Sequence, residues 1–309
     1  MSATAKGRSP PLFLCIGDID VDVMIQVDRL PSRDGKVNGA LLRRAAGGMA
    51  GNVAVALSRL GAAVRILGRI GDDSDGEFAL RELEAAGVDT GFVTRLEGVA
   101  TFSCIALLTP DGEKSLVKLM TEAYCPSAED LSDRAFQGVS HVHLTSVGNF
   151  ELCRRALEAA RGVGAGASLD IERADCPLDA RELFESIRGF DLVFCNAESR
   201  RAVDTIIGDR LRGAVRSVIT TLGASGAEVE TEGLRVSSPG FAADVVDTTG
   251  AGDCFAAACL YARIVQGHDW ADALRFANRA ASLSTTGLGA QSALPTASQV
   301  LSMLTDNQA

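Results

Sequence analysis

The chain lacks the cysteine spacing of a disulfide scaffold or a zinc site. Its eight cysteines are scattered over 309 residues without a CxxC pair or a metal-ligand pattern. Most of them stand in apolar runs, at Cys15, Cys104, Cys195, Cys254 and Cys259. This placement predicts reduced, buried thiols rather than disulfides.

The chain also has fewer positive than negative charges and lacks long hydrophobic runs. The 30 Lys and Arg residues are outnumbered by 40 Asp and Glu, so the formal net charge is −10. Nucleic acids and anionic membranes are bound through clustered Lys and Arg, so neither is expected as a main partner. No stretch reaches about 18 uninterrupted apolar residues, and the opening MSATAKGRSPP has no apolar core of a secretion signal. We therefore expect a cytoplasmic protein.

Aromatic residues make up only 5% of the chain, whereas hydrophobic residues make up 47%. Short continuous apolar runs alternate with amphipathic segments, which predicts strands alternating with helices. The expected strands are 12–16, 64–67, 141–144, 167–170, 192–195 and 218–221, and the expected helices are 52–60, 74–86, 151–161, 178–187, 253–265, 271–284 and a last one from 296. This order predicts an α/β fold with a mostly parallel sheet covered on both faces.

Two segments, 21–44 and 101–119, break the alternation. Both contain strand-like runs where a crossover helix would be expected, and Pro110-Asp111-Gly112 is a hairpin signal. We expect a small β-structure beside the main sheet. No repeat, low-complexity tract or linker divides the chain, so residues 1–309 are interpreted as one domain with these two segments inserted in it.

A glycine-rich turn, DTTGAGDCF at 247–255, lacks the lysine of a Walker-type loop. It leads into a predicted helix, so it offers backbone N–H groups and the positive end of a helix dipole to an anion. Gly250 and Gly252 allow a ligand to approach the backbone closely. Asp253 has two interpretations: it caps the helix, or it takes a proton from a hydroxyl that attacks a phosphoryl group held by the turn.

Two other motifs carry polar residues to predicted strand or helix ends. In GDIDVDV, after the first strand, Asp18, Asp20 and Asp22 alternate and point to one side of an extended segment. They are either exposed carboxylates or hydroxyl-binding groups at the carboxyl end of a strand. In GGMAGN, glycines precede a helix and Asn52 offers a donor and an acceptor to a hydroxyl, unless the motif is only a tight turn.

Two further patterns are interpreted as decoys. GVGAG at 162–166 follows a predicted helix and precedes a strand, which is the reverse of a dinucleotide-binding turn. His141 and His143 share one strand face, but no third ligand is evident, so zinc is not expected.

Together these motifs resemble those of the ribokinase/PfkB family of carbohydrate kinases. GDIDVD, GGMAGN, GRIGDDSDGE, TLGASG, DTTGAGD and GLGAQ follow the family's order between about Leu12 and Pro295. The resemblance implies a ribokinase-like α/β fold, with a central mostly parallel sheet flanked by helices and a small β-sheet lid. It also implies ATP-dependent phosphorylation of a primary hydroxyl of a sugar or sugar-like substrate, with ATP and Mg²⁺ as cofactors.

The resemblance assigns roles to individual positions. Asp253 matches the general base, and Gly250, Ala251 and Gly252 match the anion hole. The implied sugar contacts are Asp20, Asp22, Gly48 and Asn52, and the implied nucleotide contacts are Asn196, Thr221, Gly223, Gly226 and Asn278.

The chain departs from the family pattern in three places. The family's Asn-x-x-Glu, linked to magnesium, is matched by Asn196 with Glu198 one residue early. Either Glu198 acts from this position, or magnesium depends on water and phosphate oxygens alone. Thr145 stands near a position where ribokinases carry a sugar-binding glutamate, which weakens ribose as the substrate. The segment 287–293 lacks a clean match to the monovalent-cation loop, which leaves K⁺ activation open.

Three alternatives remain open for the substrate and the activity. A nucleoside kinase would carry the same motifs, with lid aromatics stacking on the base. A sugar-phosphate kinase would need further cations, which Lys36, Arg43 and Arg44 could supply. A non-catalytic sugar- or nucleotide-binding sensor would share the fold but would have no need of Asp253.

The small β-structure also predicts an assembly. One of its faces is expected to cover the sugar, and the other to leave Leu41, Leu107 and Leu116 uncovered, depending on register. Sheets with an uncovered apolar face tend to find a partner. We therefore expect a homodimer joined lid to lid, as in several members of the family.

Overall fold

The computed structural model describes residues 10–111, 113–145, 148–176 and 179–305. Its main sheet consists of β1 (Leu12–Ile16), β4 (Ala63–Gly71), β5 (Asp89–Leu96), β8 (His141–Leu144), β9 (Gly166–Ile171), β10 (Leu192–Asn196), β11 (Ser217–Thr221), β12 (Ala227–Thr231) and β13 (Leu234–Ser238). The nine strands lie in the order β13-β12-β11-β10-β9-β8-β1-β4-β5. In this order, the seven strands from β11 across to β5 run parallel to one another. Strands β12 and β13 pair antiparallel at the opposite edge.

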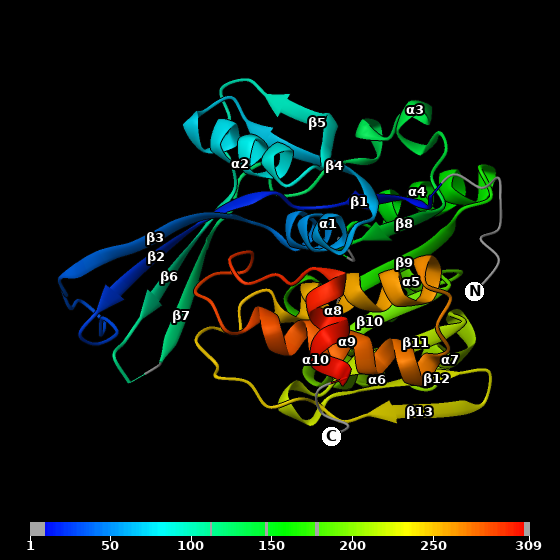
Figure 1. Cartoon of the computed structure of the whole chain (residues 1–309). Helices are drawn as coiled ribbons and strands as arrows, with labels where there is room; N and C mark the ends of the chain where they lie inside the picture. Colours follow the sequence, from blue (N-terminus) through cyan, green and yellow to red (C-terminus); the bar gives the residue numbers. More distant parts are fainter. Residues whose placement is uncertain (1–9, 112, 146–147, 177–178, 306–309) are drawn as a thin grey trace.

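Helices cover both faces of this sheet (Figure 1). They are α1 (Met49–Leu60), α2 (Ser74–Ala85), α3 (Asp133–Phe136), α4 (Phe150–Gly162), α5 (Ala180–Ile187), α6 (Ala197–Ile207), α7 (Arg210–Ala214), α8 (Ala251–Leu260), α9 (Trp270–Ser284) and α10 (Ala297–Thr305). Strand β1 shows how the core divides. Phe13 and Cys15 belong to the cluster that includes α1, α8 and α9, whereas Leu14 and Ile16 belong to the cluster that includes α4 and α5. A strand buried on both faces is continuously apolar for this reason.

The expected α/β architecture is confirmed, with differences at element ends. The helix expected over 253–265 begins earlier, at Ala251, and its last turn, Tyr261–Val265, is a π-helix. Residue 178, the expected start of another helix, lies outside the described residues. Strands β5, β12 and β13 were not expected, because none of the three has a continuous apolar run.

The two irregular segments form a separate four-stranded sheet, which we call the small sheet: β2 (Asp20–Val27), β3 (Gly39–Gly47), β6 (Ser103–Leu108) and β7 (Lys114–Leu119). Its strand order is β3-β2-β6-β7. It projects from one side of the main body (Figure 1, left). Strands β6 and β7 pair antiparallel, as the hairpin signal predicted, although Gly112 of that signal lies outside the described residues.

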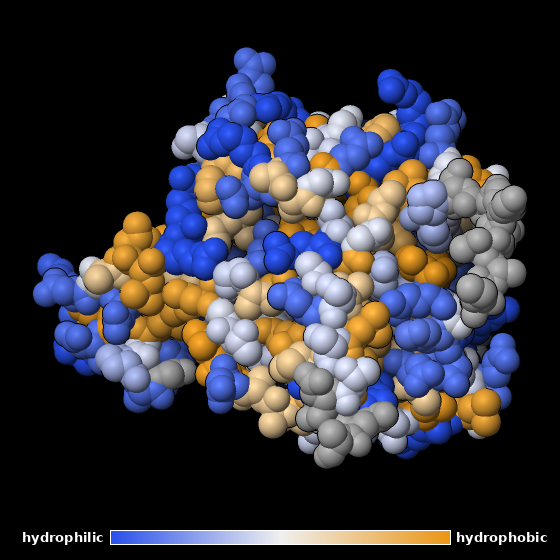
Figure 2. All heavy atoms as spheres, viewed as in Figure 1, coloured by the Kyte–Doolittle hydropathy of each residue, from blue (hydrophilic) through white to orange (hydrophobic). Residues whose placement is uncertain are grey.

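The register of the small sheet corrects one expectation about its faces. Leu116 pairs with Ala106, one residue before Leu107, so Leu107 and Leu116 lie on opposite faces. Leu116 lines the cavity described below, where it is 57% exposed and so uncovered as expected, and Leu41 lies on the outer face with Leu107. Hydrophobic residues gather over the small sheet in Figure 2.

The five cysteines expected in apolar runs are buried as free thiols: Cys15, Cys104, Cys195, Cys254 and Cys259. Burial raises the pKa of each of these thiols. They therefore remain protonated at neutral pH and contribute mainly to packing.

The two strand histidines belong to the buried core of the sheet. His141 Nε2 and His143 Nδ1 each lie 2.8 Å from the hydroxyl oxygen of Ser168 on the neighbouring strand. Burial lowers the pKa of His141 to about 4 and that of His143 to about 3, so both rings are neutral. Each ring thus contacts the Ser168 hydroxyl through one nitrogen, and Nε2 of His143 is buried without a hydrogen-bond partner among the described residues.

Candidate active site

The first turn of α8 is built to leave its N-terminus open. Gly250 caps the helix in the left-handed conformation, with φ of 74°. A Cβ there would lie 2.6 Å from the Cβ of Ala290, so only glycine fits. A Cβ at Gly252 would meet no described atom within 4 Å, so packing does not explain that glycine. No side chain caps this N-terminus, and within the turn the N–H of Ala251 donates to the carbonyl of Thr248 at 3.2 Å. A helix N-terminus without a side-chain cap can receive an anion, as expected for this turn.

Asp253 does not act as a simple cap of this helix. It lies inside the first turn with 8% of its surface exposed, and its Oδ2 accepts a hydrogen bond from Asn52 Nδ2 at 2.8 Å. Burial is the main cause that raises its pKa well above the usual value, and the nearby charge of Asp170 adds to it. The hydrogen bond from Asn52 opposes this rise. A carboxyl group in this state is closer to the pKa that a general base needs at neutral pH.

Asn52 is itself held in one orientation. Its Oδ1 accepts a hydrogen bond from Gln291 Nε2 at 3.0 Å, so its amide nitrogen must face Asp253. The hydrogen bond between Asn52 and Gln291 joins the start of α1 to the GLGAQ loop near the end of the chain. Asn52, an expected sugar contact, thus also contacts Asp253.

Asp18, the first acid of GDIDVDV, supports the start of α1. Its carboxylate accepts hydrogen bonds from the backbone N–H of Met49 at 3.0 Å and of Ala50 at 3.3 Å. The cap residue Gly48 has no side chain that could do this. The Thr145 hydroxyl also donates to Asp18, at 3.1 Å. Thr145, the position of a family departure, therefore helps to hold Asp18.

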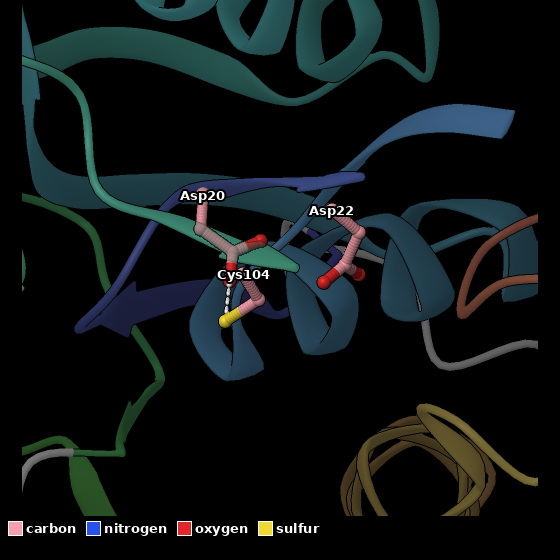
Figure 3. A group of neighbouring side chains, drawn as sticks. All are labelled: Asp20, Asp22 and Cys104. Carbon is pink, nitrogen blue, oxygen red and sulfur yellow. Dashed lines mark hydrogen bonds between the residues drawn. The ribbon is translucent and has the colours of Figure 1, made fainter. Parts of the chain in front are cut away.

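Asp20 and Asp22 lie side by side on β2, both buried (Figure 3). Oδ2 of Asp20 accepts a hydrogen bond from the thiol of Cys104 at 3.4 Å, whereas its Oδ1 is buried without a partner in the described structure. Burial raises the pKa of Asp20 well above its usual value, with Asp22 the next cause, and raises that of Asp22 to about 6. A ligand hydroxyl would satisfy the unpaired oxygen of Asp20.

This trio suits a hydroxyl ligand better than a metal ion. Ligand atoms of Asp20, Asp22 and Cys104 lie within 4.8 Å of one another. However, the thiol already donates to Asp20, and burial raises its pKa, so it stays protonated. Metal ions bind the thiolate form, and they would have to displace this proton.

The predicted residues converge on a cavity of about 360 Å³ between the small sheet and the main sheet, which we call the acidic cavity. Its predicted lining residues are Asp20, Asp22, Gly48, Asn52, Asn196, Thr221, Gly250, Gly252 and Asp253. Asp170 and Glu172, which were not predicted from the sequence, also line it. A signal was available, because Asp170 lies near the carboxyl end of an apolar strand, β9, and Glu172 directly follows it. Burial raises the pKa of Asp170 to about 7.

A second cavity of about 330 Å³ adjoins the first, and we call it the apolar cavity. Its predicted lining residues are Thr221, Gly223, Gly226, Ala251, Gly252 and Asn278. Its walls also contain Phe241, Val245 and Ala281. The two cavities share Thr221, Thr248, Gly252 and Phe255, so they meet at the N-terminus of α8. This arrangement can hold two ligands on either side of one anion-binding turn.

Asn278 has a structural role in the wall of the apolar cavity. Its amide nitrogen donates to the backbone carbonyls of Ser238 at 3.0 Å and Pro239 at 3.1 Å. Both hydrogens of the amide are thereby used to hold the chain after β13 against α9. Only its carbonyl oxygen remains to contact a ligand.

Asn196 and Glu198, the two residues compared with the family's Asn-x-x-Glu, lie in different surroundings. Asn196 lines the acidic cavity and caps α6, accepting hydrogen bonds from the N–H groups of Glu198 and Ser199. The Glu198 carboxylate is 62% exposed and pairs with Arg173. Glu198 is not among the described residues that line either cavity.

The small sheet contacts the glycine-rich turn through Lys114. Its ammonium group donates to the Thr249 hydroxyl and lies 3.8 Å from Asp247 Oδ1. Asp247 also accepts hydrogen bonds from Thr249 and, at 2.9 Å, from the N–H of Gly289. One carboxylate thus ties the turn before α8 to the GLGAQ loop and to the small sheet.

The three cations proposed for a sugar phosphate lie outside the acidic cavity. Lys36 is exposed, Arg43 donates to a backbone carbonyl at 2.8 Å, and Arg44 pairs with Asp75. None of the three is among the described lining residues. The cation that lines the cavity is Lys118 of β7, which sequence analysis did not single out.

Fold and site together define a kinase that transfers a phosphoryl group to a carbohydrate. The family model described as "pfkB family carbohydrate kinase" matches residues 11–297. The chain belongs to the pfkB family of carbohydrate kinases, and it is an ATP-dependent carbohydrate kinase by class.

Curated relatives cover nearly the whole chain. An "ATP-dependent ribose-1-phosphate kinase" of Halopiger xanaduensis is 34% identical over 303 residues, which is 95% of this chain and 98% of the relative. A "Ribokinase" of Bacillus subtilis is 30% identical over 298 residues, covering 94% and 98%. A "Fructokinase-1" of Zea mays is 28% identical over 287 residues, covering 84% and 88%.

Solved structures agree with the fold. Arabidopsis thaliana ribokinase, complexed with ribose and ATP, superposes with a TM-score of 0.82 at 25% identity, covering 96% of this chain and 99% of that one. Xylella fastidiosa fructokinase with bound ATP gives 0.82 at 26% identity, with the same coverage. A nucleoside kinase of Methanocaldococcus jannaschii gives 0.83 at 22% identity, covering 97% and 100%, and shows the fold alone.

Proposed function

We propose that this kinase transfers the γ-phosphoryl group of ATP to a primary hydroxyl of a sugar, with Asp253 as the general base. The observation that carries the proposal is the meeting of the two cavities at the N-terminus of α8. The sugar would occupy the acidic cavity, and ATP would occupy the apolar cavity. Asp253 lines the acidic one, where the hydroxyl would be.

The residues around Asp253 have distinct roles in this proposal. Asp253 accepts the proton of the attacking hydroxyl, and its raised pKa suits that task. The N–H groups of Gly250, Ala251 and Gly252 stabilise the charge on the transferring phosphoryl group. Asp20 and Asp22 accept hydrogen bonds from other hydroxyls of the sugar and so orient it.

The donor set also fits MgATP. The open N-terminus of α8 suits phosphate oxygens, and the carboxylates of Asp170 and Glu172 line the same cavity. When bound, Mg²⁺ neutralises phosphate charge. Asp170 and Glu172 would hold it, directly or through water, in place of the displaced Glu198. Dependence on K⁺ stays a prediction, to be measured by exchanging K⁺ for Na⁺ in the assay.

The cavity favours a sugar over a nucleoside. The strands of the small sheet contribute Asp20, Asp22, Cys104, Leu116 and Lys118 to it, and these strands contain no aromatic residue. The aromatic rings among the described lining residues belong to Phe102, Phe194 and Phe255, each at most 2% exposed. A base would find no open ring on which to stack.

We further propose that two copies associate through the outer faces of their small sheets, and that the protein is cytoplasmic. Leu41, Val117 and Leu119 are 68%, 48% and 44% exposed, and they lie on the face turned away from the cavity. An exposed apolar face of this kind favours burial against a second copy of the protein.

Within the described residues, no helix is both long and apolar enough to span a membrane.

The decisive experiment measures turnover with a panel of acceptors. The purified chain is assayed with MgATP and ribose, fructose, ribose 1-phosphate and a nucleoside, and the phosphorylated position is located by NMR. Asp253→Asn should lower kcat about 10²- to 10⁴-fold and change ATP affinity little. Asp28→Asn, at an exposed aspartate after β2, is the matched control. Half of the normal turnover in Asp253→Asn, with chemistry rate-limiting, would exclude the assigned base.

A further inference from the structure

Lys114 extends from the small sheet to the glycine-rich turn before α8. It is the first residue of β7, and its ammonium group donates to the Thr249 hydroxyl, 135 positions later in the chain. The same nitrogen lies 3.8 Å from Asp247 Oδ1. Thr249 lines the acidic cavity, whereas Lys114 is not among the described lining residues. Lys114 therefore contacts a wall residue of the cavity.

This contact begins a chain of hydrogen bonds that ends at one carboxylate. The Thr249 hydroxyl accepts from Lys114 and donates to Asp247 Oδ1 at 2.6 Å, and the N–H of Thr249 donates to the same oxygen at 3.0 Å. Hydrogen bonds in such a chain polarise and strengthen one another. The residue after Thr249 is Gly250, which caps α8. The start of the helix that would receive phosphate is thus tied to the small sheet.

Asp247 places a negative charge beside the turn where phosphate is proposed to bind. Its side chain is 9% exposed, and that of Lys114 is 29% exposed. Burial acts to raise the pKa of this carboxyl group, but hydrogen bonds from Thr249 and Gly289 and the nearby ammonium group lower it overall. An ionised carboxylate repels phosphate. The ammonium group of Lys114 offsets this repulsion, because it brings a positive charge to the same turn.

The same ammonium group acts on an acid of the proposed sugar site. Burial is the main cause that raises the pKa of Asp22 to about 6, and the charge of Lys114 is the next cause and lowers it. Asp22 belongs to β2 and lines the acidic cavity. Strands β2 and β7 flank β6 in the small sheet. Lys114 therefore attracts one carboxylate at the sugar site and one at the phosphate turn.

We propose that Lys114 is a positioning residue that couples sugar binding on the small sheet to phosphate binding at the N-terminus of α8. This inference rests on the proposed function and adds a residue to its site. A sugar bound to Asp20 and Asp22 holds the small sheet in place, which keeps the ammonium group at the turn. Phosphate at the turn attracts the ammonium group and draws the small sheet toward the sugar. Each ligand therefore raises the affinity for the other by the same factor.

The test measures this coupling by calorimetry. The acceptor with the highest kcat/KM in the panel above is titrated into the enzyme with and without the non-hydrolysable ATP analogue AMP-PNP and Mg²⁺. The proteins compared are the unmodified enzyme, Lys114→Met, Lys114→Gln and Lys114→Arg. Lys36→Met, at an exposed lysine between β2 and β3, is the matched control. Thermal unfolding followed by circular dichroism confirms that each variant is folded.

AMP-PNP should raise the affinity of the unmodified enzyme for the acceptor about tenfold or more. In Lys114→Met this factor should fall below about threefold, while the affinity for the acceptor alone changes less than about threefold. The kcat of this variant should fall about 10- to 100-fold, the effect of losing one charged contact. Lys114→Arg and Lys36→Met should keep the coupling of the unmodified enzyme, because the charge is retained in the first and the contact in the second.

Several results would refute this role of Lys114. They are an unchanged coupling factor in Lys114→Met, an absence of coupling in the unmodified enzyme, and full coupling in Lys114→Gln, which can still donate to Thr249 but has no charge. Transfer of phosphate to an acceptor without such coupling refutes only this inference. A chain that binds ATP but phosphorylates no acceptor of the panel refutes the proposed function, and this inference with it.

Discussion

Asn52 Nδ2 donates a hydrogen bond to Asp253 Oδ2 at 2.8 Å, although the two residues are 201 positions apart in the chain. Both side chains are buried, at 6% and 8% exposure. A charged acceptor in such a place depends strongly on its donor, because water cannot replace it. Burial raises the pKa of the proposed general base, and a residue of α1, oriented by Gln291, opposes this rise.

The first prediction concerns the pH profile of Asn52→Leu. Activity requires ionised Asp253, so it falls as the pH falls through the pKa of that carboxyl group. The Asn52 hydrogen bond lowers this pKa, so its loss should raise it and move the acid limb of kcat/KM upward. We expect a shift of about 1–2 pH units, the equivalent of one charged hydrogen bond.

The matched control is Asn38→Leu, at an exposed asparagine before β3. Gln291→Met should shift the acid limb in the same direction by a smaller amount. Asn52 would keep the amide group that donates to Asp253 but lose the hydrogen bond from Gln291 that orients it. An unchanged acid limb in Asn52→Leu would show that the contact does not tune the base.

The second prediction concerns Asp20→Ala and Asp22→Ala. Each would leave a sugar hydroxyl unpaired in a closed cavity, at a cost of about 1.5–3 kcal/mol. The loss should appear in kcat/KM for the sugar, with ATP affinity measured in the absence of sugar nearly unchanged. Comparable damage to ATP affinity would place these residues at the nucleotide or in the fold.

The third prediction concerns stability and Asp22→Asn. The folded-state pKa of Asp22 is raised from 3.8 to about 6, mainly by burial. Its contribution to stability is therefore fully present below about pH 4 and is lost as the pH rises through 6. Without ATP and Mg²⁺, Asp22→Asn should raise Tm at pH 8 and have little effect at pH 4. Each kcal/mol gained corresponds to about 2–4 °C.

Asp28→Asn provides the comparison, because this exposed aspartate follows the same strand. Thermal unfolding followed by circular dichroism at both pH values is sufficient. If Asp22→Asn lowers Tm at pH 8, the ionised carboxylate stabilises the fold, and burial is not the dominant influence on it.

The fourth prediction concerns assembly through the outer face of the small sheet. Leu107→Asp combined with Val117→Asp should give monomers, because both side chains lie on that face. The expected monomers should also have a raised KM for the sugar, since the inner face of the same sheet lines the cavity. Sedimentation at tens of micromolar distinguishes the species. Leu234→Asp on β13, where Leu234 is 67% exposed, is the control. An unmodified protein that sediments as a monomer would refute the proposal.

The sequence by itself determined most of the parallel strands of the main sheet and the kind of chemistry. In a continuous apolar strand such as 12–16, the side chains on both faces must be buried. Such strands therefore predicted a parallel sheet with helices on both sides. Glycines before Asp253 predicted an open helix N-terminus, because conformational freedom and free N–H groups are local properties of the chain. Such features depend on neighbours in sequence, and a single chain contains that information.

Only the tertiary structure decided which side chains meet. The register of β6 and β7 put Leu116 in the cavity and Leu107 outside, since a slip of one residue exchanges the two faces of a strand. The bond between Asn52 and Asp253, and the placement of Lys118 opposite Glu172, join segments far apart in sequence. These contacts follow from how the small sheet and the helices pack on the main sheet, and that packing is a property of the whole chain rather than of any motif.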